Sequence, residues 1–400
     1  TMDSASTWRS DLKAADRYDN IERLKACIEA RGLSALGTSQ KAAFAAETEA
    51  YNNSESRDEY DSACKALVEA VPRIPETGYP TPTGPGISIG RYQGCHHLTN
   101  GLVSEVYRSS AVALKVITET RNVEPHNSTR EVKILNQISH PFIIKLVETF
   151  QDNEGRLVLV FPFMPFTLAK IIDSGSLPED LVHSCFHDLF SALDYLHQNG
   201  IIHRDVKPSN LLLASPNGPA LLADFGTTWH PTLSLIDEPA DHKVLEVGTT
   251  CYRAPETLFG NRSYDTSLDM WAAGTMLAEC LRRCPKPLFE SRGTSEDGNQ
   301  LGLILSIFKT VGTPTKATWP EAVDFSTPPF EWYQEFPGHS WEELLPAACE
   351  SGRDLVRGLV RYESAKRLTA TQARHSHHTL GHLLTLSTQA LQHDFFKSSK

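Results

Sequence analysis

The stretch HRDVKPSNLLL, residues 203–213, decides the fold, and it is followed by LLADFG at 221–226 and YRAPE at 252–256. Phosphoryl transfer asks little covalent chemistry of a protein, but it needs an oriented hydroxyl nucleophile, neutralised phosphates and held metal ions. The first two stretches supply a carboxylate for the hydroxyl, a lysine for phosphate, and an amide with a second carboxylate for metal. One such match arises easily by chance, whereas all three in this order do not. Together they indicate phosphoryl transfer.

On these residues the chain resembles the eukaryotic protein kinase family over about residues 89–396. The resemblance implies an α+β fold of two lobes, a small β-rich lobe over 89–164 and a large helical lobe over 165–396. The sequence agrees, because short β-branched runs from about Ile89 give way to long helical patterns after about residue 177. The resemblance also implies the use of ATP and Mg²⁺.

The resemblance assigns roles to the polar residues of the first two stretches. Asp205 is implied to be the catalytic base, and Lys207 to steady the γ-phosphate. Asn210 and Asp224 are implied to hold Mg²⁺. Lys207 is followed by Pro208, which resembles serine/threonine kinases rather than tyrosine kinases. A serine/threonine protein kinase is therefore expected.

The small lobe and the hinge between the lobes are implied to hold the nucleotide. Lys115 in VALK should bind the α- and β-phosphates and pair with Glu131 in STREVKIL. Phe161 is implied to be the gatekeeper, and the backbone around Phe163 and Met164 to meet adenine. The other residues expected at the nucleotide are Thr99, Gly101, Val106, Ala113 and Leu212.

The loop TNGLVSEV, residues 99–106, keeps one glycine where the family has three. Counted back from the valine that ends the loop, the expected positions hold Thr99, Gly101 and Ser104. Glycine is used there because backbone amides must approach phosphate closely. We expect weaker nucleotide binding with the catalytic groups intact, and therefore an active kinase. The alternative is a catalytically idle scaffold that works through its N-terminal helices.

Features outside the catalytic stretches resemble the cyclin-dependent kinases. By this resemblance Arg367 should pair with Glu256, and Asp269 in LDMWAAG should hold the backbone of the catalytic loop. The similar stretches are PHNSTRE at 125–131, VGTPTKATWPEA at 311–322 and SAKRLTATQA at 364–373.

The activation segment departs from that group. Thr249 fits the threonine that hydrogen-bonds the catalytic Asp205. Counting back from it, the residue that is usually phosphorylated falls at Val244 or Leu245, and neither can be phosphorylated. The kinase is therefore expected to be active without phosphorylation of this segment.

The missing phosphate leaves Arg204, next to the catalytic aspartate, without its usual partner. A phosphate would bring nearly two negative charges to this arginine. Asp241 or Glu246 is expected to substitute at lower charge. The alternative is that Arg204 is simply solvated.

The glycine-poor loop, the absent phosphosite and a short strand connection together resemble the small CDK-activating kinases of fungi. The short connection predicts a tight turn near Ser109 and Ser110. This resemblance implies a folded cyclin-dependent kinase as substrate, phosphorylated on its activation-loop threonine. The alternative is a proline-directed kinase with other substrates, since Arg253 resembles the residue that shapes a proline pocket. Gly248 should make that pocket more permissive. Thr129 leaves dependence on a cyclin-like subunit open.

Charge and composition argue against other classes. The formal net charge is -11, so nucleic acid is not an expected partner, because phosphate contacts need clustered Lys and Arg. No window approaches about 18 uninterrupted apolar residues, so no membrane span is expected. The N-terminus is too polar and acidic for a signal or transit peptide. The 8 cysteines form no CxxC pair, which favours reduced thiols in the cytoplasm or nucleus.

Three segments fall outside the kinase pattern. Residues 1–71 are predicted to form a helical extension, because Trp8 and Leu12 open a run of apolar residues at helical spacing. Residues 72–88 are a Pro/Gly-rich linker. The tripeptide TQA occurs twice near the end of the chain, which predicts an insertion at 374–390.

Overall fold

A computed structural model describes most of the chain. The described residues are 8–9, 12–30, 38–54, 56–70, 84–119, 124–175, 177–290, 300–330 and 334–372. The predicted insertion at 374–390 and most of the predicted linker at 72–88 lie outside them. The chain divides into two compact units: the first consists mainly of residues 1–77, and the second comprises residues 78–214 and 219–400. None of the helices in the described ranges has the length and apolar character needed to cross a membrane.

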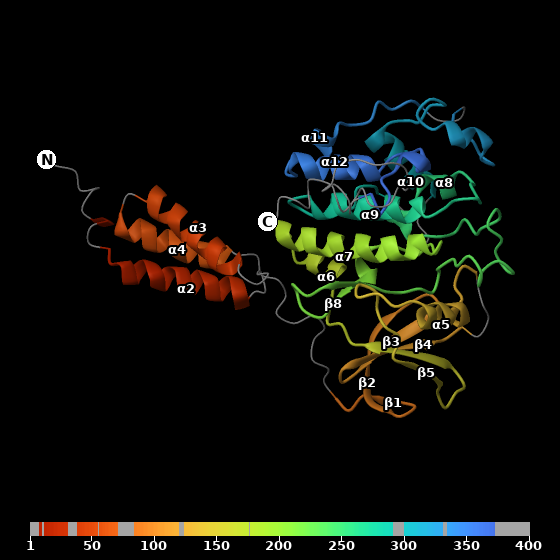
Figure 1. Cartoon of the computed structure of the whole chain (residues 1–400), viewed down its shortest axis with the longest axis horizontal. Helices are drawn as coiled ribbons and strands as arrows, with labels where there is room; N and C mark the ends of the chain where they lie inside the picture. Colours follow the sequence, from red (N-terminus) through yellow and green to blue (C-terminus); the bar gives the residue numbers. More distant parts are fainter. Residues whose placement is uncertain are drawn as a thin grey trace, which may run out of the picture. The chain divides into compact units, whose positions relative to one another are not determined.

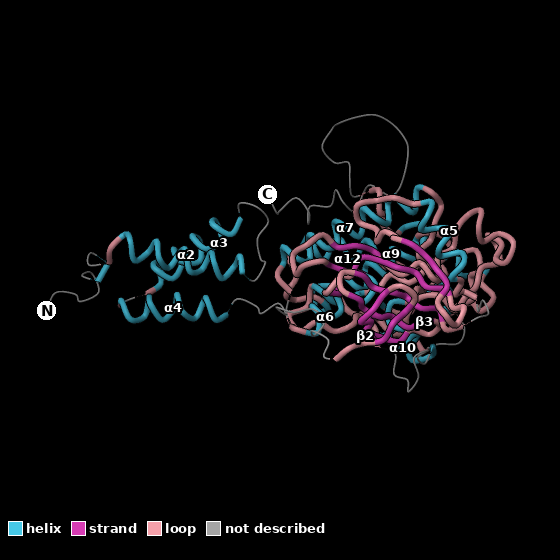
Figure 2. The backbone as a smooth tube through the Cα atoms, turned by 90° about the horizontal axis from the view of Figure 1, so that it is seen from below, coloured by secondary structure: helices cyan, strands magenta, loops and turns pink. Residues whose placement is uncertain are grey.

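The first unit is built from helices (Figure 2). They bury an apolar and aromatic core. An ion pair is enclosed with it: Glu47 accepts two 2.7 Å hydrogen bonds from Arg17 and a third, also 2.7 Å, from the Tyr60 hydroxyl. The Glu47 side chain is fully buried, and these donors compensate its charge. The helices are α2 (Ala14–Ala30), α3 (Thr38–Asn53) and α4 (Arg57–Ala70). The core residues are Trp8, Leu12, Ala50, Tyr60 and Cys64.

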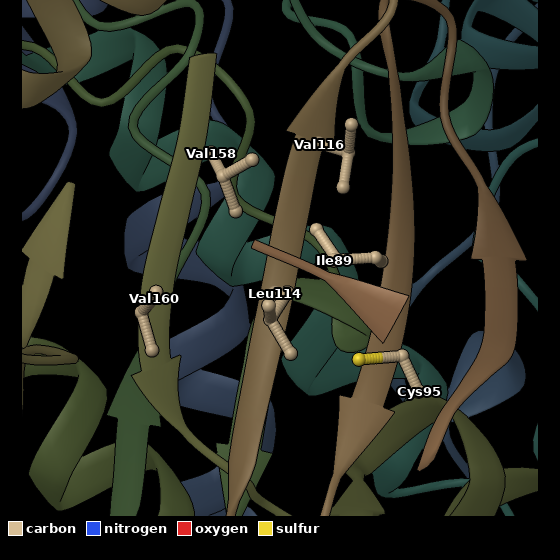
Figure 3. Close-up of a cluster of buried hydrophobic side chains, with 6 residues drawn as sticks. All are labelled: Ile89, Cys95, Leu114, Val116, Val158 and Val160. Carbon is tan, nitrogen blue, oxygen red and sulfur yellow. The ribbon is translucent and has the colours of Figure 1, made fainter. Parts of the chain in front are cut away.

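In the described part of the second unit, the small lobe is a six-stranded antiparallel sheet in the order β1-β2-β3-β4-β6-β5. Alternate residues of a strand point to the same face. Leu114 of β4 therefore meets Val158 and Val160 of β6 in one buried cluster, which Ile89 and Cys95 extend (Figure 3). The elements of this lobe are β1 (Ile87–Ile89), β2 (Tyr92–Asn100), β3 (Ser104–Ser109), β4 (Val112–Ile117), α5 (Ser128–Gln137), β5 (Glu148–Gln151) and β6 (Leu157–Pro162).

Two local features set β4 and α5 in place. The β3–β4 connection is a two-residue turn in which Ser110 has a φ of 51°, so the predicted tight turn next to Ser109 is present. Helix α5 begins after the N-cap Asn127, whose side chain accepts a 2.9 Å hydrogen bond from the Arg130 N–H. The helix then buries Glu131 on its inward face.

The large lobe is organised around α9, whose residues Leu268 to Cys280 are all buried. Such a helix suits the centre of a lobe because it is mostly apolar and is buried on every side. Helices α7 and α12 flank α9 (Figure 1). At Gly274 an added Cβ would lie 2.6 Å from the Cβ of Leu359 on α12, so this close approach requires glycine.

The large lobe also contains a three-stranded antiparallel sheet, β7-β8-β9, among its described residues. The predicted α+β arrangement of a β-rich lobe followed by a helical lobe is confirmed. The elements are β7 (Phe166–Thr167), α6 (Leu168–Asp173), α7 (Glu179–Gln198), η1 (Pro208–Asn210), β8 (Leu211–Leu213), β9 (Ala220–Leu222), η2 (Thr250–Tyr252), α8 (Pro255–Leu258), α9 (Ser267–Cys280), α10 (Gln300–Val311), η3 (Pro320–Asp324), α11 (Trp341–Leu344), α12 (Glu350–Leu359) and η4 (Ser364–Lys366).

A buried ion pair ties α8 to the segment after α12. Arg367 donates to both carboxylate oxygens of Glu256, at 2.6 and 2.7 Å, and neither side chain is more than 1 % exposed. This paired geometry satisfies both charges in the lobe interior. The predicted pair is therefore present.

Candidate active site

A cleft of about 480 Å³ lies between the small-lobe sheet and the large lobe. Almost all residues predicted for the nucleotide and the chemistry line it. Asp205 is not in the lining, but it is hydrogen-bonded to Asn210 and paired with Lys207, which are. The predicted residues in the lining are Thr99, Gly101, Val106, Ala113, Lys115, Glu131, Phe161, Phe163, Met164, Lys207, Asn210, Leu212 and Asp224.

Some lining residues were not predicted. Ser209 and Ala223 each directly precede a predicted residue, and that adjacency was the available signal. Ile144 arrives from the connection after α5, where its N–H donates to the Leu222 carbonyl at 2.9 Å. Nothing in the local sequence of Ile144 indicates this position. The other lining residues outside the predicted set are Leu98, Asn100, Ser104, Pro162, Thr167, Ala169 and Lys170.

Lys115 is the centre of an ion cluster in the cleft. It pairs in register with Val106 of β3, and its Nζ lies 2.8 Å from both Glu131 oxygens and 2.7 Å from Asp224 Oδ1. Burial disfavours the charged lysine, but the two carboxylates outweigh it and raise the pKa of Lys115. Burial also opposes the charge of Asp224, yet Lys115 holds the pKa of that carboxyl below its ordinary value. At Glu131 burial prevails over Lys115 and the pKa is raised.

Asp269 of α9 holds the catalytic loop. Its carboxylate accepts backbone hydrogen bonds from His203 at 2.9 Å and Arg204 at 2.8 Å, and it lies 2.9 Å from His197 Nε2. Arg204 has a φ of 71°, a conformation that residues with a side chain rarely adopt. The hydrogen bonds of Asp269 stabilise this strained turn, and the predicted support of the loop is present.

Three side chains fix Asp205. Its Oδ1 accepts a 2.7 Å hydrogen bond from Thr249 Oγ1, and its Oδ2 lies 2.7 Å from Lys207 Nζ and 3.1 Å from Asn210 Nδ2. Lys207 also donates to Thr249 Oγ1 at 2.8 Å. The predicted contact between Thr249 and Asp205 is therefore present. The network holds one carboxylate in a fixed orientation, as an acceptor for a hydroxyl requires.

Asn210 and Asp224 offer oxygen ligands of the kind that Mg²⁺ prefers. The Asn210 amide nitrogen makes both hydrogen bonds to Asp205, at 2.8 Å to its backbone carbonyl and 3.1 Å to Oδ2, which leaves the amide oxygen as the ligand atom. Asp224 remains ionised because its pKa is lowered. Amide and carboxylate oxygens are hard ligands, so these residues fit Mg²⁺.

Comparison with known proteins agrees with this geometry. Residues 94–379 match the family model of the protein kinase domain. The chain belongs to the protein kinase family. The serine/threonine-protein kinase csk1 of Schizosaccharomyces pombe is 37 % identical over 282 residues, which cover 67 % of this chain and 88 % of csk1. Cyclin-dependent kinase D-1 of Arabidopsis thaliana is 35 % identical over 275 residues, which cover 68 % of this chain and 65 % of that protein.

This kinase is accordingly a serine/threonine protein kinase of the cyclin-dependent kinase family, and it uses ATP and Mg²⁺. The predicted resemblance to that group is confirmed. When bound, Mg²⁺ neutralises the phosphates of ATP during transfer of the γ-phosphoryl group.

The activation segment of the kinase corrects one prediction. Arg204 is 1 % exposed, so it is not solvated. Its partner is Glu238, whose carboxylate binds Nη1 and, at 3.1 Å, Nη2, whereas Asp241 and Glu246 are exposed. The segment folds back in a turn, closed by a 2.8 Å hydrogen bond from the Glu238 N–H to the Ser234 carbonyl, which carries Glu238 inward. The prediction of Asp241 or Glu246 as the partner of Arg204 was wrong because residue spacing along the segment does not reveal this turn.

Gly248 and Arg253 form the part of the kinase expected to meet the residue after the phosphorylated one. Gly248 has a φ of 79°, and its carbonyl accepts hydrogen bonds from Arg253 Nε at 3.3 Å and Nη2 at 3.1 Å. An added Cβ would lie 3.5 Å from Arg253 Cα, which is ordinary contact. Glycine at position 248 is therefore favoured by the positive φ of the backbone, and not by a lack of space for a side chain. A more permissive pocket stays a prediction.

Proposed function

We propose that this kinase activates cyclin-dependent kinases by phosphorylating the threonine of their activation loop. The main support for this proposal is the activation segment of the kinase itself. Val244 and Leu245 stand where a phosphorylated residue is expected, and Arg204 already binds a carboxylate of the same chain. A kinase that needs no activating phosphate suits the first step of a cascade that switches other kinases on.

The site residues have the following roles in this proposal. Asp205 accepts the hydrogen bond of the threonine hydroxyl and takes up its proton. Lys207 steadies the γ-phosphate, and Asn210 with Asp224 holds Mg²⁺. Lys115 contacts the α- and β-phosphates from its place between two carboxylates.

Activity without a cyclin-like subunit is part of the proposal. Contacts within the chain hold α5 at the active site. The Asn127 N–H, before the helix, donates to the Gly226 carbonyl at 2.9 Å, and Glu131 of the helix binds Lys115. Thr129, where a cyclin-binding kinase has an apolar residue by resemblance, is exposed on α5. Phosphotransfer by the purified single chain, unchanged when a cyclin is added, supports this part, and a large stimulation contradicts it.

A proline-directed kinase with other substrates is the second candidate. Arg253 already occupies the Gly248 carbonyl, so the backbone N–H of the residue after the phosphorylated one finds no acceptor there. Proline has no N–H and loses nothing at such a site. This observation favours a proline in that position when the substrate is a flexible peptide.

The two candidates differ in what a folded substrate contributes. A folded cyclin-dependent kinase offers docking area beyond the target threonine, which lowers dependence on local sequence. We therefore compare kcat/KM for an intact, catalytically dead cyclin-dependent kinase with kcat/KM for a short Ser/Thr-Pro peptide. The proposal expects the intact kinase to be preferred by about tenfold or more. An equal or better peptide makes this an ordinary proline-directed kinase.

A further inference from the structure

Glu238 occupies a buried position where two arginines and the activation segment meet. Its side chain is 1 % exposed. Its carboxylate binds both terminal nitrogens of Arg204 and accepts a 2.7 Å hydrogen bond from the Val244 N–H. Arg130 Nη1 lies 4.0 Å from Oε2 of the same carboxylate. Glu238, Arg204, Arg130 and Val244 are called the Glu238 cluster below.

The cluster joins three parts of the active site. Arg204 directly precedes Asp205 in the catalytic loop, and Arg130 directly precedes Glu131 in α5. Val244 is a position at which a phosphorylated residue was expected, and its amide touches the Glu238 carboxylate. One carboxylate therefore links the catalytic loop, the helix that holds the ATP lysine, and the activation segment.

We infer that Glu238 is a positioning residue that takes the place of an activation-segment phosphate. A phosphate beside two arginines would gather them through charge-assisted hydrogen bonds. Glu238 makes hydrogen bonds of the same kind, and its negative charge is permanent and does not depend on phosphorylation by another kinase. The inference concerns phosphoryl transfer itself and does not depend on which protein is the substrate.

The two arginines require an anion at this place. The Arg204 side chain is 0 % exposed, and a buried guanidinium without a partner is strongly destabilising. Arg130 binds Glu124 at 3.0 Å and the Pro125 carbonyl at 2.8 Å, but its Nε is buried without a hydrogen-bond partner. Removing the charge of Glu238 would leave Arg204 uncompensated and Arg130 with less compensation.

The segment that carries Glu238 is itself anchored. Trp229 Nε1 donates to the Glu238 carbonyl at 3.0 Å, and two backbone hydrogen bonds of 2.9 and 3.0 Å join Trp229 to Ile202, just before the catalytic loop. The Lys243 ammonium lies over the Trp229 and Tyr264 rings, at 4.8 and 5.3 Å from their centroids. Packing of the segment against the large lobe therefore sets the position of the carboxylate.

Glu238→Gln tests the inference because it keeps the shape of the side chain and removes its charge. We expect kcat to fall roughly 10- to 100-fold, since a small displacement of catalytic groups has effects of this size. The KM for ATP should stay within about twofold, because Arg130 keeps its bonds to Glu124 and the Pro125 carbonyl, which hold α5 in place. Glu238→Asp keeps the charge on a shorter side chain and should retain more activity than Glu238→Gln.

Matched controls separate positioning from a general loss of charge or stability. Asp241→Asn and Glu246→Gln remove charges at exposed positions of the same segment and should leave kcat unchanged. Glu47→Gln breaks the buried pair with Arg17 in the N-terminal unit and should lower thermal stability without changing kcat. The inference is wrong if Glu238→Gln keeps the wild-type kcat, or if the exposed substitutions lower kcat equally.

Phosphatase treatment of the wild-type kinase adds an arm that needs no variant. The rate should be unchanged, and mass spectrometry should find no phosphate on residues 229–247. Ser234 is 0 % exposed and accepts a 2.9 Å hydrogen bond from the His230 N–H, so it is not open to a kinase in this conformation. A lost rate that an upstream kinase restores through Thr232 or Ser234 would overturn the inference, even if Glu238→Gln fails to fold.

Discussion

The two walls of the ATP cleft differ in how far they keep the pattern of protein kinases. Residues 203–210 together with Asp224 are called the floor, and residues 99–106 the roof. The floor keeps every polar group of the family and gives each a partner, as the three side chains around Asp205 show. The roof has one glycine where the family has three.

The structure of the roof explains which glycines the chain can do without. Thr99 and Ser104 lie in β2 and β3, where the backbone is extended and side chains are tolerated. Gly101 lies in the turn: its N–H donates to the Ser104 carbonyl at 2.7 Å, and an added Cβ would lie 3.2 Å from Ser104 Oγ. We propose that the floor governs the chemical step and the roof governs nucleotide affinity, so substitutions should separate kcat from KM.

A large effect is expected on the floor, from Asp224→Asn. The substitution removes a charged oxygen ligand for Mg²⁺, and loss of several kcal/mol of charge stabilisation lowers kcat about 10³-fold. Steady-state kinetics of the purified variant measure this, with the exposed Asp241→Asn as control. A variant with more than half of the wild-type kcat would show that Asp224 has no such role.

A smaller loss of activity is expected from Asp269→Asn, because Asp269 supports the backbone of the catalytic loop in the floor. The amide cannot accept all the hydrogen bonds that the carboxylate takes from His203, Arg204 and His197, and a buried unsatisfied donor costs about 1–3 kcal/mol. Thermal unfolding should show this loss, and kcat should fall roughly 10-fold because the loop is displaced. Asp265→Asn, at an exposed position just before α9, is the control. If both variants have the same melting temperature and the same kcat, Asp269 does not support the floor.

Gly101→Ala tests the roof. The new Cβ meets Ser104 within 3.3 Å, so about 1 kcal/mol of crowding should raise the KM for ATP roughly fivefold. The kcat should stay within about twofold, because no catalytic group moves. A fall in kcat with an unchanged KM would contradict the division between floor and roof.

The smallest effect is expected when the family's glycines are restored. The double substitution Thr99→Gly with Ser104→Gly frees the backbone amides to approach phosphate, and the KM for ATP should fall about twofold. Glycine in two strands also weakens them by about 0.5–1 kcal/mol each, which should appear as a lower melting temperature. A higher KM would mean that the present side chains contribute to ATP binding.

Contacts between motif residues were predictable from the sequence. Glu131 meets Lys115, and Thr249 meets Asp205, because each partner stands at a spacing that the fold of the family determines. Arg367 and Glu256 belong to the same class, although they are far apart along the chain. Each of these pairs joins residues of recognisable motifs, and the order and spacing of such motifs indicate where they meet in the fold.

The partner of Arg204 was not predictable in the same way. Glu238 reaches it because a turn closed on Ser234 folds the activation segment back, and no periodic pattern marks the path of an irregular segment. Ile144 reached the cleft through a similar connection. The prediction that a carboxylate of this segment pairs with Arg204 is confirmed, but the residue is Glu238 and not Asp241 or Glu246. Distance along an irregular chain does not give distance in space.

Transfer of radiolabelled γ-phosphate from ATP to a catalytically dead cyclin-dependent kinase tests most directly that the chain is an active kinase with an intact floor. We expect label in the substrate with the wild-type protein. With Asp205→Asn we expect roughly 10²- to 10⁴-fold less label, because a general base is lost, while ATP binding and the melting temperature are retained. Equal labelling by both proteins, or none by the wild type with any protein substrate, would contradict this and leave a scaffold in the shape of a kinase.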